Sequence, residues 1–102
     1  MNESEPRLPS AKELVVLGML ASKREMYGLE LVQASGGKLG RGTIYVTLMR
    51  MEDKGYVSSK QLMDEKSSGL PKRVFSITGF GQRALAAARS ASSVLFGLGI
   101  QA

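Results

Sequence analysis

Cysteine and histidine are both absent from this sequence of 102 residues. Their absence excludes disulfides, thiolate and imidazole metal ligands, cysteine nucleophiles and any mechanism that needs a histidine base. We therefore expect no metal site, no cofactor and no enzymatic activity, although a site built from carboxylates alone stays formally open. A chain without cysteine also suits a reducing cytoplasm, where we expect this protein to act.

Long apolar runs and a secretory signal are also missing. The longest apolar run, residues 14–21, is far shorter than the roughly 20 residues that a bilayer crossing needs. Residues 1–9 are polar, acidic and contain proline, without the basic start and apolar stretch of a signal peptide. We therefore expect residues 1–9 to form a flexible N-terminal arm, and we predict no association with a membrane.

Positive charge is in excess and unevenly distributed. The formal net charge is +5, which favours polyanionic partners, either nucleic acid or an acidic membrane surface. Residues 38–73 contain eight lysines and arginines against four acidic residues, so most of the excess is central. A chain of this length forms one domain, and domains this small often gain stability by dimerising.

Two helices are predicted in the N-terminal third. Ser10 and Glu13 have the spacing of a capping box, which predicts a helix that begins near Ala11 and ends around Ser22. A second helix is predicted over Tyr27–Ser35, before two consecutive glycines that favour a helix end. A polar segment that starts at Ser22 separates the two helices.

The third predicted helix has one apolar face. Residues 43–54 place Ile44, Leu48 and Met51 at helical spacing, and a glycine follows as a stop. The pattern then changes, because residues 56–63 and 73–77 have the length and composition of two strands around a polar loop. This pattern predicts a hairpin with a long basic tip.

A last helix is predicted after Thr78, which can cap its first turn. Small and apolar residues recur there every three or four positions, in a heptad-like pattern that is typical of helix pairing. We predict that residues 79–102 form a dimerisation helix and tail, in which five residues meet a second copy of the chain: Ala84, Ala88, Ala91, Leu95 and Leu98.

Three helices, a strand, a loop, a second strand and a final helix follow the order of a winged helix-turn-helix. The expected fold class is therefore α+β, mainly helical, with residues 10–78 as the DNA-binding domain. In this fold the third helix enters the major groove of double-stranded DNA. When the apolar face of this helix turns inward, four residues turn outward: Thr43, Val46, Thr47 and Arg50.

Side-chain chemistry indicates what this surface contacts. The Arg50 guanidinium can make a bidentate contact to guanine, whereas Thr43 and Thr47 can donate to phosphate or touch a thymine methyl. Arg50 can equally be an ordinary solvated residue on a helix surface. The six methionines, Met49 among them, favour a place in the core over an adaptable ligand pocket.

The segments on either side of the third helix add candidate phosphate contacts. A glycine-rich stretch before it suits a DNA phosphate through Lys38 and Arg41, or is a plain turn; it lacks the Gly-Lys-(Ser/Thr) ending of a nucleotide-binding loop. Tyr45 either contacts phosphate or packs between helices. The wing is expected to add five residues: Lys66, Ser67, Ser68, Lys72 and Arg73.

Three linked motifs resemble the PadR family of transcriptional regulators. GTIYVTLMRMEDKGYV at 42–57 is similar to the recognition-helix signature of that family. LVVLGMLASKREMYGLEL at 14–31 resembles its first two helices, and GLPKRVFSITGFGQRAL at 69–85 resembles its wing and the start of the next helix. The resemblance covers roughly residues 12–90.

The resemblance implies a homodimeric winged-helix repressor whose terminal helix dimerises and whose wing touches DNA. A twofold dimer in turn predicts an inverted-repeat operator. Gly40-Arg41 stands where a serine and a proline are expected, so the approach to the third helix should be more flexible and more basic. The short C-terminal part argues against an elaborate effector domain. Two alternatives stay open: a winged helix that docks onto a protein without sequence-specific DNA binding, and an effector-sensing repressor with a small-molecule pocket at the dimer interface.

Overall fold

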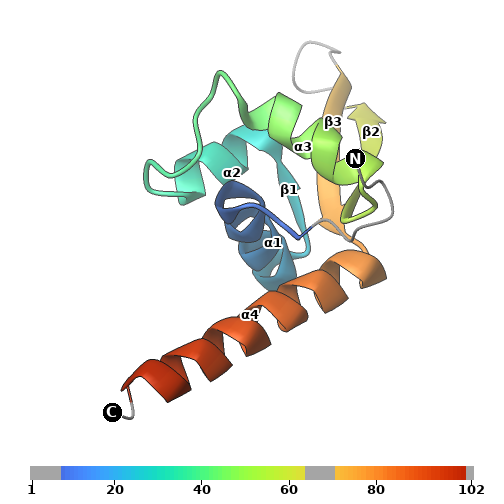
Figure 1. Cartoon of the computed structure of the whole chain (residues 1–102). Coiled ribbons are helices and arrows are strands. Elements are labelled where there is room, and N and C mark those ends of the chain that lie inside the picture. Colours follow the sequence, from blue (N-terminus) through green and yellow to red (C-terminus); the bar gives the residue numbers. More distant parts are fainter. Residues whose placement is uncertain (1–7, 64–70, 101–102) are drawn as a thin grey trace, which may run out of the picture.

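In the described part of the chain, the fold consists of a small antiparallel sheet and four helices (Figure 1). The computed structural model describes residues 8–63 and 71–100. Its elements, in chain order, are α1 (Ala11–Lys23), β1 (Glu25–Tyr27), α2 (Gly28–Ala34), α3 (Ile44–Asp53), β2 (Val57–Met63), β3 (Pro71–Ile77) and α4 (Gly79–Ile100). The predicted α+β, mainly helical winged fold is confirmed.

The first helix begins where the capping box predicts. The Ser10 hydroxyl accepts the backbone N–H of Glu13 at 3.2 Å, and the Glu13 carboxylate accepts the backbone N–H of Ser10 at 2.9 Å. These two bonds satisfy donors that a helix start otherwise leaves unpaired. α1 then runs from Ala11 to Lys23, one residue beyond the predicted end.

The sheet has one strand that the sequence analysis did not predict. β1 pairs antiparallel with β3, so the strand order is β1-β3-β2, and Met26 lies opposite Phe75. The polar segment between α1 and α2 therefore contains a strand. Three residues are too few to show the alternation that marks a strand in a sequence, and the partner of β1 lies far along the chain.

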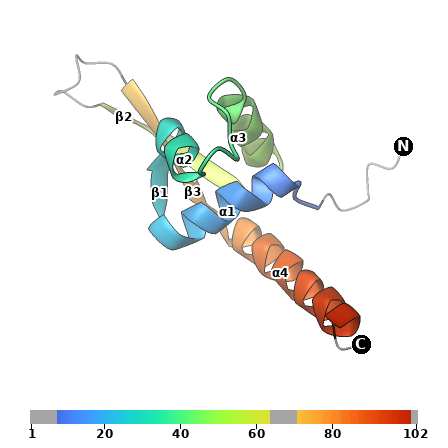
Figure 2. The ribbon, with the colours of Figure 1, turned by 90° about the vertical axis from the view of Figure 1, so that its left-hand side faces the viewer.

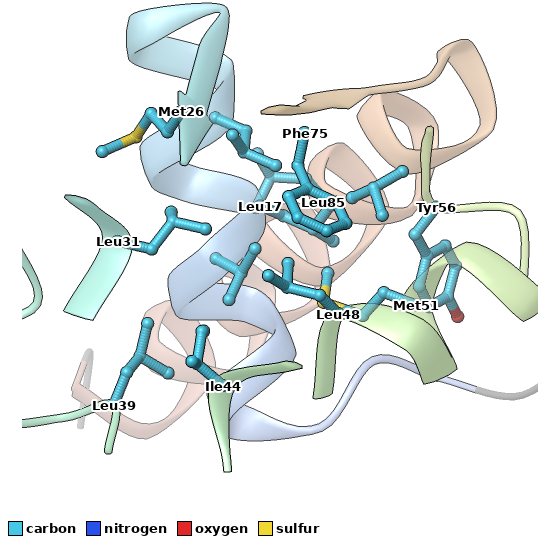
Figure 3. Close-up of a cluster of buried hydrophobic side chains, with 13 residues drawn as sticks. Leu17, Met26, Leu31, Leu39, Ile44, Leu48, Met51, Tyr56, Phe75 and Leu85 are labelled. Carbon is cyan, nitrogen blue, oxygen red and sulfur yellow. The ribbon is translucent and has the colours of Figure 1, made fainter. Parts of the chain in front are cut away.

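The core is built around α1 and the inner face of α3 (Figure 3). Val16, Leu17 and Leu20 of α1 have no exposed surface, and the predicted apolar face of α3 is buried against them. Residues from every other element described above complete this core: Met26, Leu31, Leu39, Ile44, Leu48, Met51, Tyr56, Val57, Phe75 and Leu85. Burial of the inner face of α3 orients its other face toward solvent.

The start of α4 is attached tightly to the end of α3. The Thr78 hydroxyl accepts the Gly81 N–H at 2.9 Å, as the predicted cap requires, and donates to the carbonyl oxygens of Gly55 and Tyr56. A Cβ at Gly81 would lie 2.1 Å from the Tyr56 carbonyl oxygen, so only glycine fits there. Beyond buried Leu85, α4 extends away from the body of the protein, on the side opposite α3 (Figures 1 and 2).

Candidate DNA interface

One side of α3 is open to solvent, as the helical spacing predicts. Thr43, Val46 and Arg50 are exposed, whereas Thr47 is half-buried on the flank that faces α1. Met49 is 63% exposed, so the expectation that the methionines belong to the core is wrong for this residue. Met49 is exposed because it lies on the side of α3 that faces away from the buried residues Leu48 and Met51.

A nearly buried ion pair fixes the orientation of α3. Lys54 Nζ, at the C-terminal end of α3, lies 2.9 Å from a carboxylate oxygen of Glu13 near the start of α1. The Glu13 side chain is 5% exposed and that of Lys54 is 26% exposed. Glu13 therefore caps α1 and anchors the neighbouring helix with the same carboxylate. The cap follows from the local sequence, whereas the ion pair does not, because 41 residues separate its partners.

Hydrogen bonds also connect α3 to the wing, which β2 and β3 form. Arg73 donates from Nη1 to the Ser59 hydroxyl at 3.0 Å and from Nη2 to Gln61 Oε1 at 3.3 Å. The Ser59 hydroxyl in turn donates to the Glu52 carboxylate of α3, at 3.0 Å from Oε2. Arg73, which was predicted to contact DNA, thus holds the wing against α3, and part of its donor capacity is used inside the protein.

Tyr45 packs between helices and also reaches solvent, so both of its predicted roles are compatible with its position. A Cβ at Gly28 would lie 2.7 Å from the Tyr45 ring, which shows how closely the ring contacts the start of α2. Tyr45 as a whole residue is 47% exposed, and it lines a hollow of about 420 Å³ between α2, α3 and β3. Lys72 borders this hollow, with Nζ 5.4 Å from the centre of the Tyr27 ring.

The basic loop before α3 is anchored at its middle. Leu39 is buried in the core, and its N–H donates to the Ser35 hydroxyl at 3.0 Å. Ser35 is itself buried and donates to the Val32 carbonyl at 2.8 Å. Lys38 and Arg41, on either side of Leu39, are exposed. The glycine-rich loop before α3, which was expected to be flexible, is therefore held in place at Leu39. Its glycine content alone does not indicate this contact.

Further cations surround the exposed face of α3. Lys12, at the start of α1, borders a shallow hollow together with Thr43, Thr47 and Arg50. Lys12 was not among the residues predicted from the sequence, because only the packing of α1 against α3 brings it to this surface. Within the described residues, the Arg50 guanidinium has no ion pair and no side-chain hydrogen bond. Its donors are therefore open to an external acceptor.

The remaining predicted residues belong to the tip of the wing and to α4. Lys66, Ser67 and Ser68 lie outside the described residues. In α4, Ala84 is half-buried against the core of its own chain, Ala88 is half-buried and Ala91 is exposed. The side chains of two further predicted dimerisation residues also lie outside the described part of the structure: Leu95 and Leu98.

Two structural features are absent from the part of the chain that the structure describes. None of its helices is long and apolar enough to cross a bilayer. Over residues 8–63 and 71–100, acidic residues do not gather in a group of three or more that could hold a metal ion.

A helix-turn-helix formed by α2 and α3, flanked by a hairpin wing and by exposed cations, defines a winged-helix DNA-binding domain. Residues 16–87 match the family model of the transcriptional regulator PadR-like family, and the chain belongs to this family. This is a family of transcriptional regulators and not of enzymes.

Solved structures share this fold. A PadR family transcription regulator from Clostridium difficile is 24% identical, with a TM-score of 0.76 over 90% of this chain and 97% of that one. A PadR family transcriptional regulator from Eggerthella lenta is 26% identical, with a TM-score of 0.69 over 85% and 80%. A PadR-like transcription factor from Bacteroides fragilis is 19% identical, with a TM-score of 0.75 over 86% and 85%. No curated protein matches the sequence.

Proposed function

We propose that this member of the PadR-like family is a dimeric repressor that binds an inverted-repeat operator. The observation that carries the proposal is the exposed face of α3, where Arg50 borders a hollow together with the exposed Lys12 of α1, and where further exposed cations precede the helix. Arginine and lysine contacts to phosphates supply most of the affinity in such complexes, and contacts to base edges supply the specificity. In this proposal Thr43, Thr47 and Arg50 contact bases.

The proposed phosphate contacts come from both sides of α3. Lys38 and Arg41 precede the helix, Tyr45 lies beside α2, and Lys72 lies on the wing. Arg73 shares its donors between DNA and its bonds to Ser59 and Gln61. The wing-tip contacts predicted from the sequence extend this set to residues outside the described ranges: Lys66, Ser67 and Ser68.

Dimerisation is proposed through α4. This helix extends beyond the body of the protein (Figure 2). Its exposed surface over residues 86–91 consists of three alanines, a serine and Arg89. Small residues allow two helices to approach closely, and the predicted pattern of Ala88, Ala91, Leu95 and Leu98 continues this surface. A twofold dimer places the centres of its half-sites about 10 base pairs apart, or a multiple of that distance.

Selection of bound duplexes from a random pool tests the proposal directly. The full chain should enrich an inverted repeat, and Arg50→Ala should weaken binding to the enriched duplex by about 1–3 kcal/mol, with much less effect on random DNA. Failure to enrich any sequence would favour the alternative of a module that docks onto proteins. Equal losses on both duplexes would remove Arg50 from base recognition.

The dimer is tested separately by sedimentation. Leu95→Asp should shift the full chain from dimer to monomer, because it places a charge in the proposed helix interface. Ser90→Asp is the matched control, because Ser90 is exposed on α4 and lies outside the predicted pattern. A small-molecule effector with a pocket at the dimer interface, and a cytoplasmic location, stay predictions.

A further inference from the structure

The most outward part of α3 is apolar. Successive residues of an α-helix are about 100° apart around its axis. Opposite the buried residues Ile44, Leu48 and Met51, this rotation places Val46 at the centre of the exposed face, with Met49 and Arg50 beside it. Val46 is 51% exposed and Met49 is 63% exposed. The half-buried Thr47, by contrast, lies toward α1.

We propose that Val46 and Met49 contact thymine methyl groups in the major groove, beside the base that Arg50 contacts. The proposal rests on the proposed function and names the bases that this surface selects. Within the major groove the 5-methyl of thymine is the apolar group that base edges present, whereas the other edge positions are donors or acceptors. Two exposed apolar side chains on a groove-facing helix therefore favour thymine over cytosine.

The surrounding charge favours DNA over a protein surface as the partner of these two residues. Arg50 neighbours Val46 and Met49 on the helix, Lys12 lies across the hollow on the α1 side, and Arg41 precedes the helix. The nearest acidic residues of α3, Glu52 and Asp53, lie at its C-terminal end. A recognition helix contacts base edges mainly with its N-terminal residues, which places Val46, the third residue of α3, closer to the bases than Glu52 and Asp53.

The spacing of the two residues suits adjacent base pairs. A rise of about 1.5 Å per residue separates Val46 from Met49 by about 4.5 Å along the helix axis. The base-pair step of duplex DNA is about 3.4 Å. Valine is stiff at its first side-chain torsion and presents a fixed shape, whereas methionine adjusts to the surface that it meets. We therefore expect two neighbouring thymines, on either strand, next to the guanine of each half-site.

Replacement of thymine by deoxyuridine tests this inference, because it removes only the methyl group and keeps every donor and acceptor. Duplexes enriched by the full-length protein are resynthesised with uracil at one position at a time. Each contacted methyl should contribute about fourfold in affinity, the value expected for burial of one methyl-sized group. The effect should disappear in Val46→Ala at one position and in Met49→Ala at the other.

A matched control comes from the neighbouring helix. Leu29 of α2 is also a large exposed apolar residue, and Leu29→Ala should leave the response to uracil unchanged. Retained circular dichroism and unfolding midpoints show that the variants fold, as expected for exposed positions.

The outcomes separate this inference from the function on which it rests. Selective binding of an inverted repeat with no sensitivity to uracil would overturn the thymine contacts and leave the repressor proposal standing. Uracil sensitivity that persists in both alanine variants would assign the methyl contacts to other residues and would also overturn the inference. A wild-type protein that selects no duplex overturns both proposals, and capture of a protein partner through Val46 and Met49 would then explain the exposed face.

Discussion

α3 and α4 both leave one side uncovered within the chain, but the two uncovered surfaces differ in chemistry. The Glu13–Lys54 ion pair holds the C-terminal end of α3 against α1. The exposed side of α3 carries Val46, Met49 and Arg50. α4 contacts the body mainly through its first turns, and its open side over residues 86–91 is mostly alanine.

This difference shows that the exposure of a helix face does not by itself identify the molecule that binds there. A helix surface with cations around apolar side chains complements the charged backbone and the methyl groups of DNA. A surface of small residues with little charge complements a second helix, because the two backbones can approach closely. The two helices also lie on opposite sides of the body, so a partner of one leaves the other free (Figures 1 and 2).

The largest expected effect separates the two faces of α3. Leu48→Ala should lower the free energy of unfolding by about 2–5 kcal/mol, because it leaves a cavity in the core. Met49→Ala, one residue further along, should change it by less than about 0.5 kcal/mol, because this side chain is exposed. Urea denaturation measures both, and similar losses in the two variants would contradict the assignment of inner and outer faces.

A second prediction concerns how firmly α4 is attached. Gly81→Ala should lower the free energy of unfolding by about 1–3 kcal/mol, because the new methyl meets the Tyr56 carbonyl and the Ile77 side chain. Gly79→Ala is the matched control, since its Cβ would meet only the flexible end of Arg83, at 3.5 Å. Thermal unfolding of both variants checks this, and a Gly81→Ala protein as stable as the control would show that the start of α4 can shift.

The third prediction tests whether the ion pair holds α3 in place. Glu13→Gln keeps the shape of the side chain but removes its charge, and it should cost about 1–3 kcal/mol of stability because the pair is largely buried. Glu25→Gln removes the charge from the more exposed pair with Lys60 and should cost less than about 1 kcal/mol. Denaturant titrations that rank the two variants in the opposite order would contradict this account of α3.

The smallest expected effect is on the salt dependence of DNA binding. Lys72→Ala should weaken binding to the enriched duplex and to random DNA alike, and it should flatten the salt slope by about one, as expected for one lost phosphate contact. Lys23→Ala, at the end of α1, is the control and should leave the slope unchanged. A selective loss on the enriched duplex would instead assign Lys72 to base recognition.

Local signals in the sequence predicted most of the fold. The Ser10–Glu13 capping box, the apolar spacing of α3 and the threonine before α4 each depend on residues within a few positions of one another. Such signals are readable because helix caps and helix faces are set by short-range geometry. The exposed Arg50 and Thr43 follow from the same periodicity, since the side opposite a buried helix face must turn outward.

Tertiary structure alone decided the rest. β1 forms because its backbone pairs with β3. The buried Glu13 pairs with Lys54, which is 41 residues away in the sequence. Arg73 is held by a hydrogen bond to Ser59 on the neighbouring strand of the hairpin. Lys12 lies beside the exposed face of α3 only because α1 and α3 pack against each other. Short-range patterns determine which way a segment folds and which side is apolar. Partners distant in sequence are chosen by the three-dimensional packing, which no local pattern specifies.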